Sequence, residues 1–133
     1  MGYGDWIQLK IQNNSNKTLR IQNTYLHWGK FYKYEEKNDE VNINTVNNQE
    51  IKPGDVFSFA SCGRENQWSG TEGEFDLFVG SERVCQVYWD CPFTGDNKLN
   101  AKYVKDKWFP MVPGISTSGA IGSQTITIFA TGT

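Results

Sequence analysis

The sequence lacks the long apolar runs and the surplus of positive charge that mark membrane-spanning and nucleic-acid-binding chains. No stretch approaches the roughly 18 apolar residues of a transmembrane helix, and residues 1–8 lack the basic and apolar parts of a secretory signal. Lys and Arg number 13 against 15 Asp and Glu, which gives a formal charge of −2. This balance argues against a basic face that neutralises phosphates. We expect a soluble chain without a classical signal peptide and without a nucleic acid partner.

Cysteine and histidine are also scarce, with three copies and one copy. Cys62, Cys85 and Cys91 are too few for a disulfide framework, although one pair could form. With His27 as the single histidine, the usual sulfur and nitrogen ligand sets of zinc cannot be assembled well. Most catalytic triads need a histidine, but His27 lies beside Trp28 in a predicted strand, which favours a structural imidazole. A glycosidase would need two carboxylates at a set separation, and nothing in the sequence brings two together. We therefore predict no metal, no cofactor and no catalytic residue.

Alternating apolar and polar residues, the pattern of half-buried strands, recur along the whole chain. Residues 7–11 and 19–21 alternate on either side of the turn-like residues 13–16, which predicts an opening hairpin. The other alternating segments are residues 56–59, 75–79, 84–89 and 126–128. Residues 35–49 form either an edge strand or a loop. Short strands separated by turns about every 8–12 residues indicate an antiparallel sandwich or barrel, so we expect one all-β domain.

Aromatic residues are plentiful, with five Trp, six Tyr and eight Phe. Tyr88 and Trp89 are neighbours in a predicted strand, so only one of them can face the core of a two-sheet fold. Trp68 and Phe93 lie in polar loops, which favours a surface position. Exposed rings of this kind suit the headgroup layer of a bilayer and bind quaternary ammonium groups. The tryptophans assigned to the core or its rim are Trp6, Trp28 and Trp89.

Several short motifs, in this order and spacing, resemble those of the aegerolysins. They are Trp28-Gly29-Lys30, Cys62-Gly63-Arg64, Gly70-Thr71, Gly73-Glu74-Phe75-Asp76-Leu77 and Tyr88-Trp89-Asp90-Cys91-Pro92. The N-terminal residues 3–6, the pair 107–108 and the segment 118–122 also fit. The resemblance covers nearly the whole chain and implies a single domain over residues 1–133. The implied fold is an antiparallel β-sandwich like that of the actinoporin-like cytolysins.

The resemblance also implies a function and a partner. Aegerolysins bind membrane lipids, often sphingomyelin with cholesterol or ceramide phosphoethanolamine, and some act on insect membranes. Many are cytolytic only with a larger partner of the membrane-attack-complex/perforin type, which supplies the pore. We accordingly expect the targeting component of a two-component pore-forming toxin. Such a protein is cytoplasmic in its producer or released from it, and then lies peripherally on target membranes.

We expect nine residues to take part in lipid binding, either because they match family positions or because their place in the sequence favours exposure. They are Trp6, Trp28, Trp68, Ser69, Glu72, Tyr88, Asp90, Phe93 and Trp108, and we expect those carried over from the family to lie in or near one lipid-facing end. Ser69 stands where some members have a carboxylate, and Phe93 stands where Trp is common. A carbohydrate-binding β-sandwich, with exposed aromatic rings as a stacking platform, is the alternative interpretation.

Overall fold

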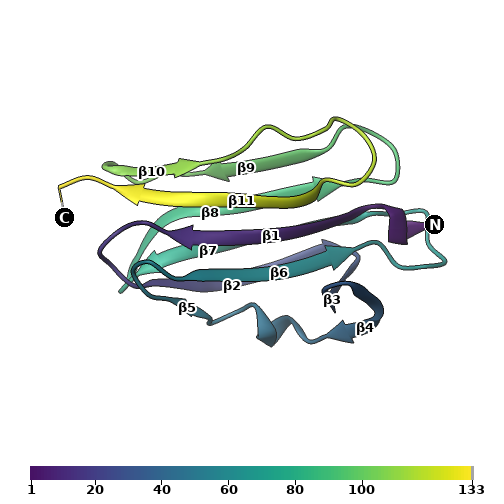
Figure 1. Ribbon diagram of the computed structural model, residues 1–133, viewed down its shortest axis with the longest axis horizontal. Coiled ribbons are helices and arrows are strands. Elements are labelled where there is room, and N and C mark those ends of the chain that lie inside the picture. The colour runs from purple at the N-terminus through teal and green to yellow at the C-terminus, as the bar shows by residue number, and fades with distance from the viewer. Residues whose placement is uncertain (133) are drawn as a thin grey trace.

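Two stacked β-sheets build the molecule (Figure 1). The structure is a computed structural model that describes residues 1–132. The strand orders are β10-β11-β1-β6-β3-β4 in the six-stranded sheet and β5-β2-β7-β8-β9 in the five-stranded sheet. The strands are β1 (Trp6–Asn13), β2 (Leu19–Trp28), β3 (Lys30–Lys33), β4 (Glu36–Val41), β5 (Glu50–Ile51), β6 (Val56–Cys62), β7 (Thr71–Val79), β8 (Glu82–Cys91), β9 (Lys98–Lys102), β10 (Trp108–Met111) and β11 (Gly122–Ala130), and the short 3-10 helices are η1 (Gly2–Gly4) and η2 (Ile43–Thr45).

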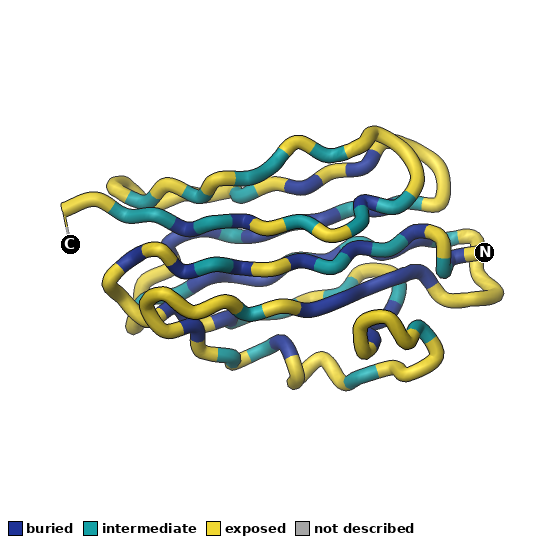
Figure 2. Tube along the Cα trace, viewed as in Figure 1, coloured by how far each residue is buried: buried dark blue, intermediate teal, exposed yellow. Residues whose placement is uncertain are grey.

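The hydrophobic core lies between the sheets because each strand turns alternate residues inward. Along β1 the odd-numbered residues are buried and the even-numbered residues reach toward solvent (Figure 2). The centre of the core is aromatic, with the Phe59 ring centroid 5.7 Å from that of Phe75 and 5.0 Å from that of Trp89. Gly73, opposite Trp89 on the adjacent strand, makes room for the indole, since a Cβ at Gly73 would collide with it. The predicted all-β sandwich is confirmed.

The predicted opening hairpin is wrong. β1 pairs in parallel with β11 and antiparallel with β6, whereas β2 belongs to the other sheet. The turn after β1 therefore crosses between sheets. The Asn13 side chain anchors this crossing: its amide donates to the carbonyls of Lys17 and Ile51 at 2.7 and 2.8 Å, and its Oδ1 accepts from the Ser15 N–H. Both edges of β1 are already occupied, so β2 must pair elsewhere.

The other strand predictions are confirmed with refinements. β6, β7, β8 and β11 cover the alternating segments. Residues 35–49 combine both expected states, because β4 is an edge strand and η2 lies in the loop that follows. Among the described strands, only the pairing of β1 with β11 is parallel. Within residues 1–132 the cysteines Cys62, Cys85 and Cys91 are all buried and free, so the disulfide left open by the sequence is not formed.

The two ends of the sandwich carry different elements. The end at which β1 begins and β2, β6 and β8 finish is termed the N pole; it also holds η1 and the loops 63–70 and 92–97 (right in Figure 1). The opposite pole holds the start of β10 and the end of β11. Chain segments far apart in the sequence therefore meet at the N pole.

Candidate functional site

A cleft of about 240 Å³ opens at the N pole. The ends of β2, β7 and β8 form it together with the loops that precede β7 and follow β8. Its lining residues are Trp28, Trp68, Ser69, Gly70, Thr71, Glu72, Asp90, Pro92, Phe93 and Thr94.

Three exposed aromatic rings border the cleft. The exposed fractions are 59% for Trp28, 71% for Trp68 and 36% for Phe93. The Trp68 and Phe93 rings meet edge to face, with centroids 5.0 Å apart and planes at 87°. These two rings hold each other in place across two loops, and they form a corner rather than a flat platform.

Trp28 faces solvent because the chain leaves the five-stranded sheet at this point. A register shift separates Leu26 from Trp28 in β2, and Gly29 follows with a φ of 92°. Glycine adopts that conformation at little cost, and a Cβ on Gly29 would meet the Cys62 carbonyl oxygen at 2.5 Å. The chain then enters β3 in the other sheet and leaves the Trp28 indole at the corner. Of the two places expected for Trp28, the core or its rim, the structure gives the rim.

Two carboxylates stand among the aromatic rings. Glu72 on β7 lies directly opposite Asp90 on β8, and the Tyr88 hydroxyl donates a hydrogen bond to Glu72 Oε2. Burial and then the neighbouring Glu72 charge raise the pKa of Asp90, while Lys98 opposes the rise. Like charges on directly opposed strand residues destabilise a sheet. A cation bound in the cleft would remove part of that repulsion.

The cleft unites most of the residues singled out in the sequence. Those in its lining are Trp28, Trp68, Ser69, Glu72, Asp90 and Phe93. Tyr88 reaches the cleft only through its hydrogen bond to Glu72. Sequence reasoning missed Thr71, which begins β7, and Thr94, whose only signal was its place beside Phe93.

Trp6 and Trp108 lie outside the cleft. Trp6 is at the N pole, but it packs on the outer face of the six-stranded sheet against a small cluster that includes Tyr32. Trp108 pairs with Ala130 at the far end of β11. Trp108 therefore lies at the pole away from the cleft, because β10 joins β11 there, and its role in lipid binding stays a prediction.

Comparison with known proteins identifies the family. Residues 4–131 match the family model named Aegerolysin. This chain belongs to the aegerolysin family. Asp-hemolysin of Aspergillus fumigatus is 35% identical over 95% of this chain and 93% of its own, and ostreolysin A6 of Pleurotus ostreatus is 30% identical over 95% of each. The aegerolysin Aa-Pri1 of Cyclocybe aegerita is 32% identical over 98% of this chain and 93% of its own.

Solved structures give the same result for the fold. The RahU protein in complex with a TRIS molecule superposes with a TM-score of 0.90 at 32% identity, covering 98% of both chains. IP-1A from Alcaligenes faecalis superposes with a TM-score of 0.87 at 36% identity, covering 98% of this chain and 94% of its own. The lipid binding protein Nakanori shares the fold alone, with a TM-score of 0.58 at 10% identity.

As an aegerolysin, the protein belongs to a family whose relatives are named for lysis rather than for a catalysed reaction. Its one imidazole is engaged outside the cleft, where His27 Nε2 lies 3.0 Å from Glu74 Oε1. Within residues 1–132 no helix has both the length and the apolar character to cross a bilayer.

Proposed function

We propose that the cleft at the N pole binds the zwitterionic headgroup of a membrane sphingolipid. The observation that carries this proposal is the meeting of three exposed aromatic rings with two carboxylates in one small cleft. Aromatic faces attract an organic ammonium group by cation–π interaction, and a desolvated contact of this kind is worth about 2 kcal/mol. A choline or ethanolamine group supplies such a cation.

The two carboxylates of the cleft also favour binding of this cation. Its positive charge would lie beside Glu72 and Asp90, which repel each other in the empty cleft. The hydroxyl groups of Ser69 and Thr94 also line the cleft and are the donors for the lipid phosphate. The RahU protein supports the proposal, because its structure is described as a complex with TRIS, a small organic amine.

The exposed rings would also contact the interface of the bilayer. Trp68 is the most exposed of the three rings, and indoles favour the interface between headgroups and hydrocarbon. Bulk attraction to anionic lipid would add little, since the formal charge is −2. Membrane binding in this proposal therefore depends on a specific lipid, either sphingomyelin with cholesterol or ceramide phosphoethanolamine.

We further propose that a larger protein of the perforin type completes a pore once this chain has bound its lipid. Membership of the aegerolysin family and the name of the relative Asp-hemolysin support a lytic role. In this arrangement the present chain selects the membrane. The gene neighbouring its own is the first place to look for the partner, and leakage of dye-loaded vesicles with both proteins present is the assay.

Flotation with vesicles of defined composition tests lipid binding directly. Vesicles of sphingomyelin with cholesterol and of ceramide phosphoethanolamine with cholesterol are compared with phosphatidylcholine vesicles carrying the same cholesterol. We expect capture by at least one sphingolipid and little capture by phosphatidylcholine. Equal capture by all three compositions would contradict sphingolipid recognition, since phosphatidylcholine shares the headgroup of sphingomyelin.

The carbohydrate-binding alternative is tested beside it with a glycan array. Stacking platforms for sugar rings need aromatic faces that lie flat toward the ligand. Trp68 and Phe93 instead meet at 87°, which makes a corner suited to a compact cation. Capture by glycans together with indifference to sphingolipid would overturn the lipid proposal.

A further inference from the structure

A row of hydrogen bonds crosses the interior of the N pole beneath the cleft. The Trp89 indole N–H donates to Thr71 Oγ1 at 3.1 Å, and the Thr71 and Ser61 hydroxyl oxygens lie 2.6 Å apart. Ser61 Oγ in turn donates to the Lys30 carbonyl oxygen at 2.8 Å. We term these four residues the polar bridge. It joins the two sheets, because Trp89 and Thr71 belong to the five-stranded sheet and the other two residues to the six-stranded sheet.

The two ends of the polar bridge fix the direction of every hydrogen bond in it. An indole N–H only donates, and a backbone carbonyl only accepts. Because Ser61 gives its single proton to the Lys30 carbonyl, Thr71 donates to Ser61 and accepts from Trp89. All donors of the bridge are therefore used, and hydrogen bonds aligned in one direction strengthen one another.

Stability alone does not call for polar side chains at this place. The inward-facing residues of β6 and β7 are Ser61 and Thr71 at the N pole, both fully buried, and the aromatic Phe59 and Phe75 further in. Replacing both partners of a buried hydrogen bond by apolar groups of the same shape is nearly neutral for stability. A fully paired polar network instead favours one arrangement of the interior. The polar bridge therefore suits a part of the fold in which position matters.

The two cleft carboxylates are the sequence neighbours of polar-bridge residues. Glu72 follows Thr71 in β7, and Asp90 follows Trp89 in β8. Neighbouring residues of a strand face opposite sides of the sheet. Each carboxylate of the cleft is thus carried by backbone whose inward-facing side chain belongs to the polar bridge.

Trp28 is connected to the polar bridge through the glycine that follows it. β2 ends at Trp28 and β3 begins at Lys30, so Gly29 is the one residue between them. A Cβ on Gly29 would lie 3.0 Å from the Thr71 Cβ atom, which shows that the crossing packs directly on the bridge. The indole of Trp28 therefore leaves the fold at a point that Thr71 and the Lys30 carbonyl hold from two sides.

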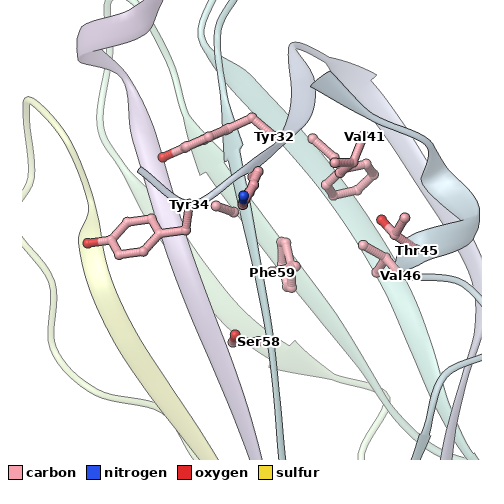
Figure 3. A pocket seen from close by; sticks show the side chains of 10 residues that line it. Tyr32, Tyr34, Val41, Thr45, Val46, Ser58 and Phe59 are labelled. Carbon is pink, nitrogen blue, oxygen red and sulfur yellow. The ribbon is translucent and has the colours of Figure 1, made fainter. Parts of the chain in front are cut away.

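Packing alone leaves the beginning of β3 loosely held. β3 pairs with β6 over residues 30–32. A cavity of about 210 Å³, lined by residues of β3, β4, β6 and the η2 loop, lies beside this pairing (Figure 3). Phe31, which follows Lys30, is part of its lining. The hydrogen bond from Ser61 to the Lys30 carbonyl supplies a restraint that close packing does not give on this side.

We infer that the polar bridge positions the cleft, with Ser61 and Thr71 as positioning residues that hold Trp28 against the two carboxylates. Ser61 lies outside the cleft lining and acts through Thr71 and Lys30. For ligand affinity this inference rests on the function proposed for the cleft. For the position of the Trp28 ring it does not.

Ser61→Ala and Ser58→Ala are the matched pair that tests the inference. Both remove a serine hydroxyl from β6, but Ser58 is exposed on the outer face of the sheet, opposite Lys10. Flotation uses the sphingolipid vesicles that the wild type binds best, well below the melting temperature of each variant, so that lost stability does not contribute. We expect Ser61→Ala to bind at least about fivefold more weakly than Ser58→Ala. Equal capture of the two variants would overturn the inference.

Ser61→Cys separates hydrogen bonding from the filling of space. Cysteine keeps nearly the shape of serine but is a weak donor and a weak acceptor. We expect Ser61→Cys to bind vesicles as weakly as Ser61→Ala. Binding equal to that of the wild type would show that Ser61 only fills space and would contradict a positioning role.

Thr71→Val breaks the polar bridge at its next member. Combined with Ser61→Ala, it should weaken vesicle binding little more than either change alone, because one break already separates the two sheets at this point. Losses that multiply in the double variant would contradict a bridge that acts as one unit.

Fluorine NMR of protein labelled with fluorotryptophan tests the position of Trp28 without any ligand. The Trp28 resonance is assigned with Trp28→Phe, and Trp108 at the opposite pole is the internal reference. We expect Ser61→Ala to shift or broaden the Trp28 resonance and to leave that of Trp108 unchanged, and Ser58→Ala to change neither. An unchanged Trp28 resonance in Ser61→Ala would refute the inference. If the wild type binds neither sphingolipid vesicle, the function proposed for the cleft fails, and this spectrum alone decides whether the polar bridge positions Trp28.

Discussion

Replacement of Trp68 by alanine separates a role in binding from a role in folding. Trp68 is 71% exposed, so only about 70 Å² of an indole of roughly 250 Å² is covered. At about 25 cal/mol per Å² the lost area costs at most about 1.8 kcal/mol. For a chain of this size the melting temperature should fall by less than about 7 °C.

Trp89→Ala is the matched control for the loss of an indole. Trp89 is fully buried, so its removal is expected to cost about 3–5 kcal/mol and to lower the melting temperature by about 12 °C or more. Lipid binding should respond in the opposite order. Loss of the Trp68 ring removes about 1–2 kcal/mol of contact with the ammonium group and the interface, which is roughly a 5–30-fold weaker affinity.

The assay is vesicle flotation with the best-captured sphingolipid composition, run beside thermal unfolding followed by circular dichroism. Trp68→Ala that melts as early as Trp89→Ala would show that the ring is structural. Trp68→Ala that binds vesicles as well as the wild type would refute the cleft as the lipid site.

Three further changes test other parts of the structure. Asp90→Asn should raise the melting temperature at pH 7, because the pKa of this carboxyl is raised in the folded state and its ionisation therefore costs stability as the pH rises. In a pH series the gain in melting temperature should vanish below the ordinary pKa of 3.8. Cation binding should weaken in the same variant. Gly73→Ala should lower the free energy of unfolding in urea by about 1–3 kcal/mol, since the new Cβ collides with the Trp89 indole; an unchanged urea midpoint would contradict that contact. Asn13→Ala should cost about 2 kcal/mol or more in the same urea assay, because two backbone carbonyls of the sheet crossing lose their donor; Asn16→Ala, at an exposed position of the same turn, is the control.

Local alternation predicts the strands well because each strand has one face against the core. β6, β7, β8 and β11 all follow from the period-two pattern. Sheet membership does not follow from it, as the first two strands demonstrate. The pattern of residues 7–21 is the same for a hairpin and for a crossing between sheets, and the strands that occupy both edges of β1 come from far along the chain.

The site could be predicted only in part, and for a physical reason. Trp68 and Phe93 stand in polar loops, so their exposure follows from their neighbours in sequence. The exposure of Trp28 depends on Gly29, where the chain passes from one sheet to the other. The position of Trp108, at the pole away from the cleft, depends on which end of β11 pairs with β10. Both are consequences of topology, which alternation leaves open.

The Tyr32 hydroxyl, which is unpaired within residues 1–132, illustrates a third limit. Tyr32 and Tyr34 are ordinary strand and turn residues by sequence, and nothing local marks the Tyr32 hydroxyl as unpaired. Tyr32 is buried in a cluster with Ala60 and Trp6, which lie on other strands of the sheet. A buried polar atom without a partner is visible only after the strands have been placed.

The opposed carboxylates of the cleft link stability to function. Selection for stability alone would replace Glu72 or Asp90, because like charges on facing strand residues repel and the burial of Asp90 adds to the cost. The Tyr88 hydroxyl donates its hydrogen bond to Glu72 and so orients that carboxylate, but it does not compensate the charge of Asp90. A cationic ligand would turn this repulsion into attraction, so the same pair that weakens the empty protein would strengthen the bound state. Stability gained by Asp90→Asn without any loss of vesicle capture would break this link and leave the carboxylates unexplained.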